Sequence, residues 1–376
     1  MIQKMKLVFA LVLAACGSSA PAPTSTAQGH SVDVMRAATW LASRQHDDGR
    51  FGEHQPDLGI TALCARALHQ SNPEAFQSQI DKAVKVVLAS QVKGGGEAGK
   101  PVGAFSDADG KFLNYKTCVC IQLLHDIDPV AHRQAIKAGQ DYIQGLQFTD
   151  EKNVRDFGAI GYGSKPVGDL SNTQFALEAL AETGVPKDSA VFQRAKDYLT
   201  RLQNFRKNPT QDPKLFDGGF PYGIAEAGDG KSEKKENPNG ESAYGSYGSM
   251  TYAGLKSMIY ASLDARDARV QAALAWIGSH YTLDENPGLA RANDPALGQQ
   301  GLFYYYHTFA KALRVAGVDK LNLTGGTKAD WKSDLREALA KRQSPEGFWI
   351  NPKDRWWEGD SQLVTAYALM ALHEAR

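Results

Sequence analysis

The stretch from Trp40 to Leu68 reads WLASRQHDDGRFGEHQPDLGITALCARAL and predicts two helices joined by a tight turn. The first helix ends at Gln45, the glycine-aromatic turn Gly49-Arg50-Phe51 follows, and a second helix runs through Thr61. Glycine is the residue that most often marks such a turn between two periodic segments. The stretch therefore predicts a helical hairpin.

The same hairpin recurs along the chain, and two residue types mark its copies. A glutamine stands five residues after an apolar residue in five copies, and Tyr281 takes the corresponding place, five after Trp276, in another. The glutamines are Gln45, Gln91, Gln147, Gln203 and Gln343. Threonines of the second helices lie 56, 56, 78, 57 and 57 residues apart, at Thr61, Thr117, Thr173, Thr251, Thr308 and Thr365. Self-similarity at such a period predicts a repeat architecture.

Composition is that of a globular protein. The chain has 376 residues, of which 42% are hydrophobic and 22% charged. Length alone allows two or three domains, but the repeat favours one closed or stacked body. The 42 basic and 42 acidic residues cancel, so no excess of charge indicates nucleic acid or an anionic membrane surface as a partner.

The first residues predict export. Lys4 and Lys6 precede an apolar run that is too short to span a bilayer but suits a signal peptide over residues 1–15. Its end, Leu13-Ala14-Ala15-Cys16, resembles bacterial lipoprotein signals, which implies a lipid on Cys16 and, because Gly17 follows, an outer-membrane location facing the periplasm. The alternative is an ordinary secretory signal with an incidental cysteine. Residues 16–31 then form a flexible tether, and 32–376 a single domain.

Three further cysteines and one long insertion leave alternatives open. Cys64, Cys118 and Cys120 lie on second helices, where one disulfide is allowed but buried free thiols are favoured. The fourth repeat has a polar run at 228–242 with almost nothing to bury. We expect a solvated loop there, either a lid over a site or a plain surface insertion.

The pattern of small and charged residues predicts two concentric layers. The second helices carry small residues that let helices crowd together in an inner ring, whereas the first helices carry the charges expected of an outer wall. Small pairs stand at Ala62 and Ala65, Ala176 and Ala179, Ala253 and Gly254, Ala310 and Ala312, and Ala366 and Ala368. Six alternating helix pairs predict an all-α double barrel.

The repeated apolar residue, glutamine and glycine-aromatic turn resemble the repeat shared by squalene–hopene cyclases and protein prenyltransferase β-subunits. The resemblance covers nearly everything after His30, and the runs at 169–173, 248–255 and 304–308 look like starts of inner helices. It implies an (α/α)6 toroid with a central cavity, which in that family often holds an isoprenoid.

The catalytic signature of the cyclases is incomplete in this chain. Those enzymes protonate an alkene with an Asp-x-Asp-Asp-Thr-Ala run, in which the acid needs a neighbouring acid and hydrogen-bond support. The closest runs here are Asp57-Leu58-Gly59-Ile60-Thr61-Ala62 and Asp169-Leu170-Ser171-Asn172-Thr173. Each keeps the first Asp and the Thr but lacks the two middle acids, so the usual proton donor is missing.

Metal signatures are incomplete as well. The prenyltransferases bind zinc through an Asp, a Cys and a His, and only the His has a match here, in His307; the other two positions fall on Tyr247 and Ser249. A zinc site needs three or more protein ligands. Asp107 and Asp109 resemble part of a calcium loop, but no glutamate completes it. No metal or other cofactor is predicted.

Several residues at the starts of inner helices have both a structural and a functional interpretation. The aspartates there are either N-caps or acids and ligands. His307 either lines the cavity or is a satisfied core histidine. Aromatic residues before inner helices either stack on a sugar, wrap an apolar chain, or pack at the rim. These aspartates are Asp57, Asp169 and Asp360, and these aromatics are Tyr244, Tyr247, Trp356 and Trp357.

Two functional classes remain. The first, which the missing signatures favour, is a lipid-anchored toroid that binds a lipid, isoprenoid or glycan. The second is an isoprenoid-acting enzyme with a non-standard acid; a glycan-directed enzyme or a pure scaffold are further alternatives. Candidate catalytic residues are Asp169, Asp57 and His307. Candidate ligand-binding residues are Asn172, Tyr244, Tyr247, Tyr304, Tyr306, Trp356, Trp357 and Asp360.

Overall fold

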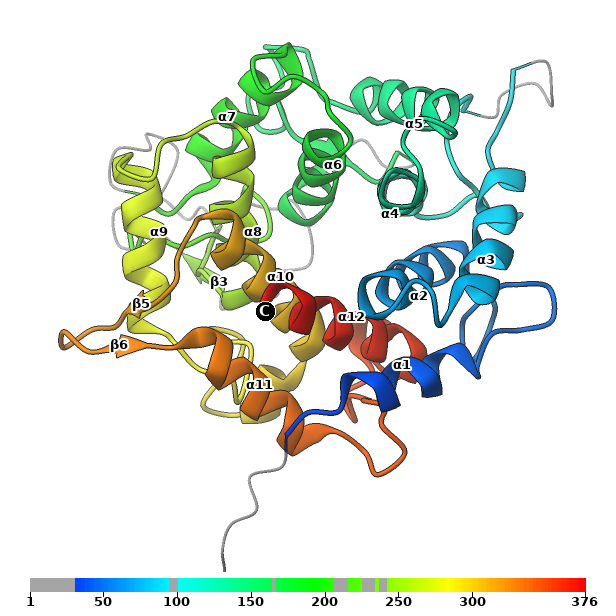
Figure 1. Ribbon diagram of the computed structural model, residues 1–376. Coiled ribbons are helices and arrows are strands. Elements are labelled where there is room, and N and C mark those ends of the chain that lie inside the picture. Colours follow the sequence, from blue (N-terminus) through cyan, green and yellow to red (C-terminus); the bar gives the residue numbers. More distant parts are fainter. Residues whose placement is uncertain (1–30, 95–100, 164–166, 206–215, 225–233, 237–241) are drawn as a thin grey trace, which may run out of the picture. The chain divides into compact units, whose positions relative to one another are not determined.

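Helices of the computed structural model alternate between two layers, as Figure 1 shows. The structure describes residues 31–94, 101–163, 167–205, 216–224, 234–236 and 242–376. The predicted signal peptide, Cys16, the tether and most of the polar run at 228–242 lie outside the described residues. Among the described residues, no helix is long and apolar enough to cross a membrane.

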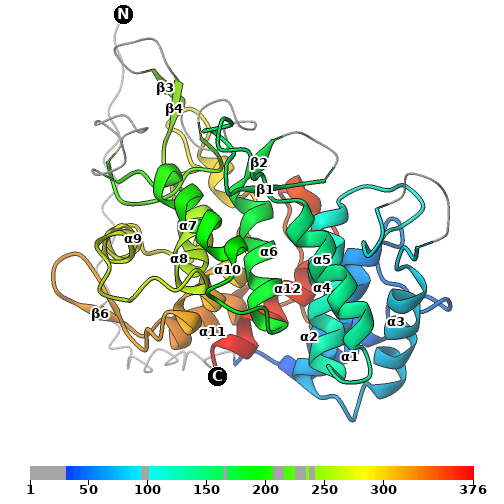
Figure 2. The same cartoon turned by 90° about the horizontal axis from the view of Figure 1, so that it is seen from above.

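The inner layer is a closed ring within the unit Ser31–Arg376. It consists of α2 (Leu58–Ser71), α4 (Leu113–Ile127), α6 (Leu170–Glu182), α8 (Gly248–Tyr260), α10 (Leu302–Val315) and α12 (Ser361–Glu374). Each inner helix packs against the next, and α12 packs against α2 (Figure 2). This arrangement confirms the predicted α/α toroid. The run 170–180 of α6 is buried throughout, as its apolar and small residues indicate.

The outer layer consists of the first helix of each hairpin. These helices are α1 (Val34–Ala42), α3 (Gln77–Ala89), α5 (Arg133–Gly145), α7 (Ala190–Leu202), α9 (Ala268–Ser279) and α11 (Trp331–Arg342). Five of these helices end before the glutamine that the sequence places in their last turn, and α9 ends before Tyr281, because this residue begins the connection to the inner helix.

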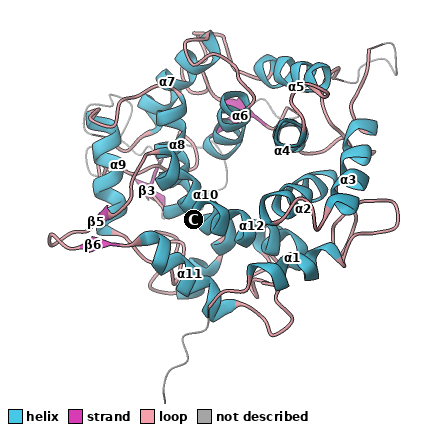
Figure 3. Cartoon of the chain, in the orientation of Figure 1, coloured by secondary structure: helices cyan, strands magenta, loops and turns pink. Residues whose placement is uncertain are grey.

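Short antiparallel ladders occur in the connections, where the sequence predicted only loops (Figure 3). In the described parts of the chain, they pair β1 (Ile160–Gly161) with β2 (Gly168–Asp169), β3 (Lys234–Glu236) with β4 (Ser242–Tyr244), and β5 (Leu321–Asn322) with β6 (Lys328–Ala329). Strands of two or three residues are too short for an alternating apolar pattern to reveal them.

The repeated glutamines link each outer helix to the next. The Nε2 atom of Gln147 donates hydrogen bonds to the carbonyl oxygens of Gly158 at 3.0 Å, in the turn, and of Val191 at 2.8 Å, at the start of α7. Gln45, Gln91, Gln203 and Gln343 make the same pair of bonds. Tyr281 takes over this role in the fifth repeat, because its hydroxyl donates to Asp334 of α11 at 2.7 Å.

The repeated threonines attach each turn to its inner helix. Thr61 Oγ1 accepts a hydrogen bond from the backbone N–H of Phe51 at 2.9 Å and donates one to the carbonyl of Asp57 at 2.7 Å. Thr117, Thr173, Thr251 and Thr365 accept from the corresponding turn residue at 2.9 to 3.1 Å. A buried polar side chain needs such partners, which explains why the same residue type returns at each repeat.

Candidate functional site

A cavity of about 710 Å³ lies where the inner helices begin. All six inner helices contribute residues from their first turns, and α2, α4, α6 and α12 contribute residues from their second turns as well. The loops that precede α2, α4, α6, α8 and α12 supply the rest. We call this side of the ring the mouth. A cavity of this size is within the usual range for small-molecule sites.

Much of the cavity wall is apolar and aromatic. Its apolar residues are Ile60, Leu63, Val119, Phe175, Met250 and Leu363. Its tyrosines are Tyr115, Tyr162, Tyr222, Tyr247, Tyr304 and Tyr367. Side chains of this kind offer large contact area and few polar groups to a ligand.

Several hydroxyl groups of this wall bind one another. Tyr115 donates a hydrogen bond to Ser171 Oγ at 2.9 Å, and the same Oγ lies 3.2 Å from the hydroxyl of Tyr304. The hydroxyls of Tyr162 and Tyr222 lie 3.1 Å apart. Burial raises the pKa of Tyr115 well above its ordinary value, so the phenol stays neutral. These bonds satisfy polar groups within the wall.

Buried ion pairs fill the ring below the cavity, towards the C-terminal ends of the inner helices. Glu182 of α6 accepts from Arg66 of α2 at 2.8 Å and from Lys311 of α10 at 2.7 Å. Glu178, one turn below Phe175, pairs with Lys256, and both side chains are almost fully buried. Against the opposing effect of burial, the charges of Arg66 and Lys311 lower the pKa of Glu182 well below its ordinary value. These buried ion pairs extend across the ring, and we call them the charged floor.

His307 belongs to this lower layer and does not line the cavity. Its ring is 5% exposed and stacks on Tyr367 with centroids 5.4 Å apart. Burial lowers the pKa of His307 well below its ordinary value, and the nearby charges of Lys256 and Lys311 add to that effect. The imidazole is therefore neutral and lies in the core. Its Nδ1 atom has no hydrogen-bond partner in the part of the chain that the structure describes, so it is a core histidine but not a satisfied one.

Asp169 is the N-cap of α6 and is 3% exposed. Its two oxygens accept hydrogen bonds at 2.8 Å from the backbone N and the side-chain Nδ2 of Asn172. Burial raises the pKa of Asp169 to about 6, although hydrogen bonds from Asn172 and from Tyr222 oppose the rise. The carboxyl group does not line the cavity, but Tyr222 lies between the two.

Asp57 and Asp360 are also N-caps, and both line the mouth. Asp57 Oδ1 accepts from the backbone of Gly59 at 2.8 Å, and its Oδ2 lies 3.1 Å from Lys116 Nζ. Asp360 Oδ1 accepts from the backbone of Gln362 at 2.9 Å. The capping interpretation of the three aspartates is confirmed.

The aspartates that resemble a calcium loop hold a lysine. Lys116 Nζ lies 2.7 Å from Asp107 and 3.5 Å from Asp109, in addition to Asp57. Its ammonium group thus takes the place that a cation would need. Across the described ranges, no group of three or more His, Cys, Asp or Glu side chains could hold a metal ion. Cys64, Cys118 and Cys120 are buried free thiols, as favoured from the sequence.

The structure brings together only part of the predicted site. Asp57, Tyr247, Tyr304, Trp356, Trp357 and Asp360 line the cavity. Tyr244 ends β4, Tyr306 donates to the carbonyl of Leu283, and Asn172 is wholly buried, so these three are not on the cavity surface.

The residues that the sequence prediction missed share one signal. Tyr115 and Ser171 stand two positions before a repeat threonine, and Val119 and Phe175 stand two positions after one. Positions two before and two after a residue are four apart, so they share one helical face with each other, on the side away from that residue, and they face the cavity in most repeats. The position of these residues relative to the repeat threonine could therefore have predicted that they line the cavity.

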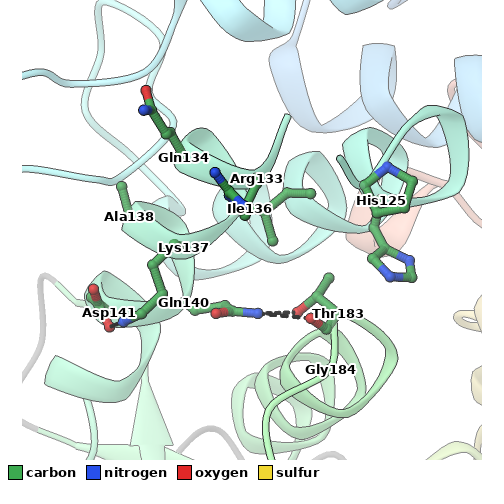
Figure 4. A pocket seen from close by; sticks show the side chains of 11 residues that line it. His125, Arg133, Gln134, Ile136, Lys137, Ala138, Gln140, Asp141, Thr183 and Gly184 are labelled. Atoms are coloured by element: carbon green, nitrogen blue, oxygen red, sulfur yellow. Dashed lines mark hydrogen bonds and ion pairs between the residues drawn. The ribbon is translucent and has the colours of Figure 1, made fainter. Parts of the chain in front are cut away.

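A second hollow of about 630 Å³ lies between α5 and the C-terminal ends of α4 and α6 (Figure 4). Some of its polar groups already have partners. Gln140 Nε2 donates to the carbonyl and the hydroxyl of Thr183, each at 2.9 Å, and Lys137 pairs with Asp141. No residue of the predicted site lies there, so the cavity at the mouth is the candidate site.

Comparison with known proteins finds solved structures of similar fold but no matching sequence. Neither a protein-family model nor a curated protein sequence matches the chain. Type II terpene cyclase MstE from Scytonema has a similar structure, with a TM-score of 0.55 and 14% identity over 91% of this chain and 97% of that one. An inactive variant of an α-1,6-mannanase from Salegentibacter sp. HEL1_6, in complex with α-1,6-mannotriose, has a TM-score of 0.56 and 10% identity over 92% and 100%. These likenesses show an α/α toroid fold.

Proposed function

We propose that this protein binds the apolar chain of an isoprenoid or lipid in the cavity at the mouth of the toroid. The apolar and aromatic wall is the observation that carries the proposal. Burying an apolar chain against such a wall is favoured by about 25 cal/mol per Å² of apolar surface. MstE, which has the same fold, has been solved with geranylgeranyl dihydroxybenzoate, a substrate with an isoprenoid chain.

The residues at the start of α6 favour a protein that binds an isoprenoid chain without cyclising it. Ser171 and Asn172 stand where the cyclases carry the two middle acids. Ser171 reaches the cavity, but its hydroxyl is shared between Tyr115 and Tyr304 and supplies no strong acid. A glycan deep in the cavity is disfavoured, because sugar hydroxyls would find few polar partners there that are not already hydrogen-bonded.

A second candidate is an isoprenoid-acting enzyme that uses Asp169. The raised pKa of Asp169, about 6, is the observation that favours it, because a buried carboxyl with a raised pKa is a feature of catalytic acids. Tyr222, which hydrogen-bonds to Asp169 and lines the cavity, would be the route for a proton. Product analysis after incubation with geranylgeraniol, for the wild type and for Asp169→Asn, separates the two candidates: only an enzyme makes a product that Asp169→Asn loses.

The proposed location is the periplasmic face of the outer membrane, through a lipid on Cys16. The signal-like start of the sequence supports it. Replacement Cys16→Ser is expected to move the protein from the membrane fraction to the soluble periplasmic fraction. Retention in the membrane fraction would contradict the proposal.

Mass spectrometry of co-purified lipids tests the main proposal. The protein is produced from Ser31, since the described contacts lie within Ser31–Arg376 and a lipid on the tether would obscure the result. We expect the wild type to carry an apolar molecule. The substitution Leu63→Trp, which fills the cavity, is expected to exclude it, whereas Val130→Trp, at a position 80% exposed and remote from the cavity, leaves it bound.

Two outcomes would overturn the proposal. One is a wild type that carries no apolar molecule and takes up none on incubation with a lipid extract. The other is equal loading of the wild type and Leu63→Trp. Because Leu63→Trp could fail to fold, thermal unfolding of each variant is measured, and Val119→Phe provides a second, smaller obstruction of the same wall.

A further inference from the structure

Three aromatic residues at the mouth have a backbone conformation that aromatic residues rarely adopt. In the described residues, positive φ angles outside glycine occur at Phe112 (54°), Ser262 (61°), Trp356 (59°) and Trp357 (70°). The three aromatic ones all line the cavity. Such a conformation costs on the order of 1–3 kcal/mol for a residue with a side chain, and it persists where the surroundings impose it, often at ligand sites.

Buried groups that directly follow the two tryptophans hold this turn in place. The next residue, Glu358, is fully buried and accepts from the backbone N–H of Tyr304 at 2.7 Å and from Asn351 Nδ2 at 2.6 Å. The carbonyl of Trp357 accepts from the backbone N–H of Asp360 at 2.9 Å. The turn is thus fixed to α10 and to α12, and it presents its aromatic rings in a fixed direction.

These rings flank the mouth from opposite sides. Phe112 is the N-cap of α4, and the ring of Trp356 packs against Gly301, the N-cap of α10, so closely that a Cβ atom there would come within 2.8 Å of it. In the order of the inner ring, α4 and α10 are opposite each other. Trp357 is 54% exposed and Phe112 39% exposed, so core packing does not account for either side chain.

We infer that the mouth is a subsite for the sugar ring of a glycolipid head group, with Trp357 as the stacking platform. The inference rests on the proposed function, because it places the head of the same ligand whose chain occupies the cavity. A pyranose has a face of C–H groups with slight positive charge, which stacks on the negative face of an indole ring. The exposed carboxylate of Asp354 lines the same mouth and suits sugar hydroxyl groups. Asp57 and Asp360 line it as well, but their oxygens already bind Lys116 or backbone N–H groups.

Charge at the mouth disfavours the other common head groups. The guanidinium of Arg355 already lies 5.1 Å from the centre of the Trp356 ring, so one of the protein's own cations occupies the face that a ligand cation would use. Asp57 is paired with Lys116, but the exposed carboxylate of Asp354 would repel a phosphate or carboxylate head. A neutral, ring-shaped and hydroxyl-rich head is the class that we infer, and a cationic head stacked on Trp357 is the alternative that the experiment separates from it.

Three detergents with the same dodecyl chain, each below its critical micelle concentration, test the inference by isothermal titration calorimetry. Dodecyl maltoside carries sugar rings, a dodecyl polyoxyethylene ether carries a neutral open chain, and dodecyl phosphocholine carries a zwitterionic head with a phosphate and a quaternary ammonium group. We expect the wild type to bind the maltoside about tenfold more tightly than the ether. In Trp357→Gly the ratio of the two affinities is expected to fall to about one, because the stacking surface is removed for the sugar ring alone, and Trp357→Tyr retains part of the preference.

Thermal unfolding distinguishes a binding role from a structural one. Glycine adopts a φ of 70° readily, so Trp357→Gly is expected to keep or raise the unfolding temperature while it loses the sugar preference. Equal affinity of the wild type for the maltoside and the ether, tighter binding of the phosphocholine, or an unchanged preference in Trp357→Gly would each overturn the inference and leave chain binding intact. Failure of all three detergents to bind would instead count against the proposed function.

Discussion

Glu53 and Ser361 lie 308 positions apart, yet Glu53 Oε2 accepts hydrogen bonds from the backbone N of Ser361 at 2.9 Å and from its hydroxyl at 2.7 Å. Although burial opposes it, these two bonds hold the pKa of Glu53 below its ordinary value. A glutamate of the loop before α2 thus caps the N-terminus of α12. Free N–H groups at a helix start favour such a carboxylate.

The same relationship recurs around the ring. Asp107, from the loop before α4, accepts from the first residue of α2, Leu58, at 3.0 Å. Asn286 accepts from Ser249 of α8 at 2.9 Å in the same way. Each loop thereby fixes the start of a neighbouring inner helix, which holds the mouth open in one shape and places the side chains that line the cavity.

The first prediction concerns closure of the outer layer. Gln343 donates to the carbonyl of Asp33 at 2.9 Å and accepts from its backbone N at 2.9 Å, so it joins the last outer helix to the first. We expect Gln343→Ala to lower the free energy of unfolding by about 1–3 kcal/mol in urea titrations, because several backbone groups lose their partners. Gln77→Ala is the control: its side chain is exposed, and the change should stay within about 0.5 kcal/mol. Equal effects of the two changes would contradict this account of closure.

The second prediction concerns the charged floor. Glu178 and Lys256 are both almost fully buried, with side chains 4% and 1% exposed. Lys256→Met leaves a buried carboxylate without its partner and is expected to cost about 3–5 kcal/mol of unfolding free energy. The double variant Glu178→Met with Lys256→Met should recover most of that loss, since no charge then remains unpaired. A double variant that costs the sum of the two single changes would show that the two charges do not act as a pair.

The third prediction concerns pH. Burial raises the pKa of Glu358 to about 7, although hydrogen bonds from Asn351 and from the backbone of Tyr304 oppose the rise. Between the unfolded value of 4.5 and about 7, the folded protein binds more protons than the unfolded chain. Stability should therefore fall as pH rises through this window, by about 3 kcal/mol for this group, and should level off above it.

Urea titrations at about pH 5 and about pH 8 measure this dependence. Glu358→Gln should reduce the loss of stability between these two values. Glu337→Gln is the control, because Glu337 is exposed and its pKa lies below its ordinary value, so it does not titrate in the window. An unchanged loss in Glu358→Gln would mean that another group is responsible, and Asp169, with a pKa of about 6, would be the next candidate.

The fourth prediction concerns the hydroxyl groups of the wall. Ser171 Oγ is hydrogen-bonded to the hydroxyls of Tyr115 and Tyr304. We therefore expect Ser171→Ala to bind an apolar ligand as tightly as the wild type, or more tightly. Isothermal titration calorimetry with farnesol measures the affinity. A tenfold loss, about 1.4 kcal/mol, would indicate instead that the hydroxyl binds the ligand directly.

The sequence predicted the ring because the residues that build it repeat. Gln147 and Thr173 act through hydrogen bonds to the backbone, which every copy of the hairpin offers, so the same residue types recur at one period. The fifth repeat shows that the position matters more than the residue type, since Tyr281 reaches α11 where a glutamine would reach the backbone.

The parts of the site that sequence reasoning missed depend on partners from distant repeats. Glu178 and Lys256 are 78 positions apart, and neither has a local signal that marks it as buried. Glu358 caps α10 from another repeat, and no local pattern predicts the left-handed conformation of Trp356 and Trp357 beside it. These features follow from closure of the ring and are invisible in any single hairpin.

Calorimetry of farnesol binding as a function of temperature tests the central claim most directly. If the chain of the ligand lies against Leu63 and Phe175, the wild type binds one molecule with a negative heat-capacity change, the signature of buried apolar surface, and Leu63→Trp does not bind. Binding of equal strength in Leu63→Trp, or a heat-capacity change near zero in the wild type, would contradict the claim that this cavity holds an apolar ligand.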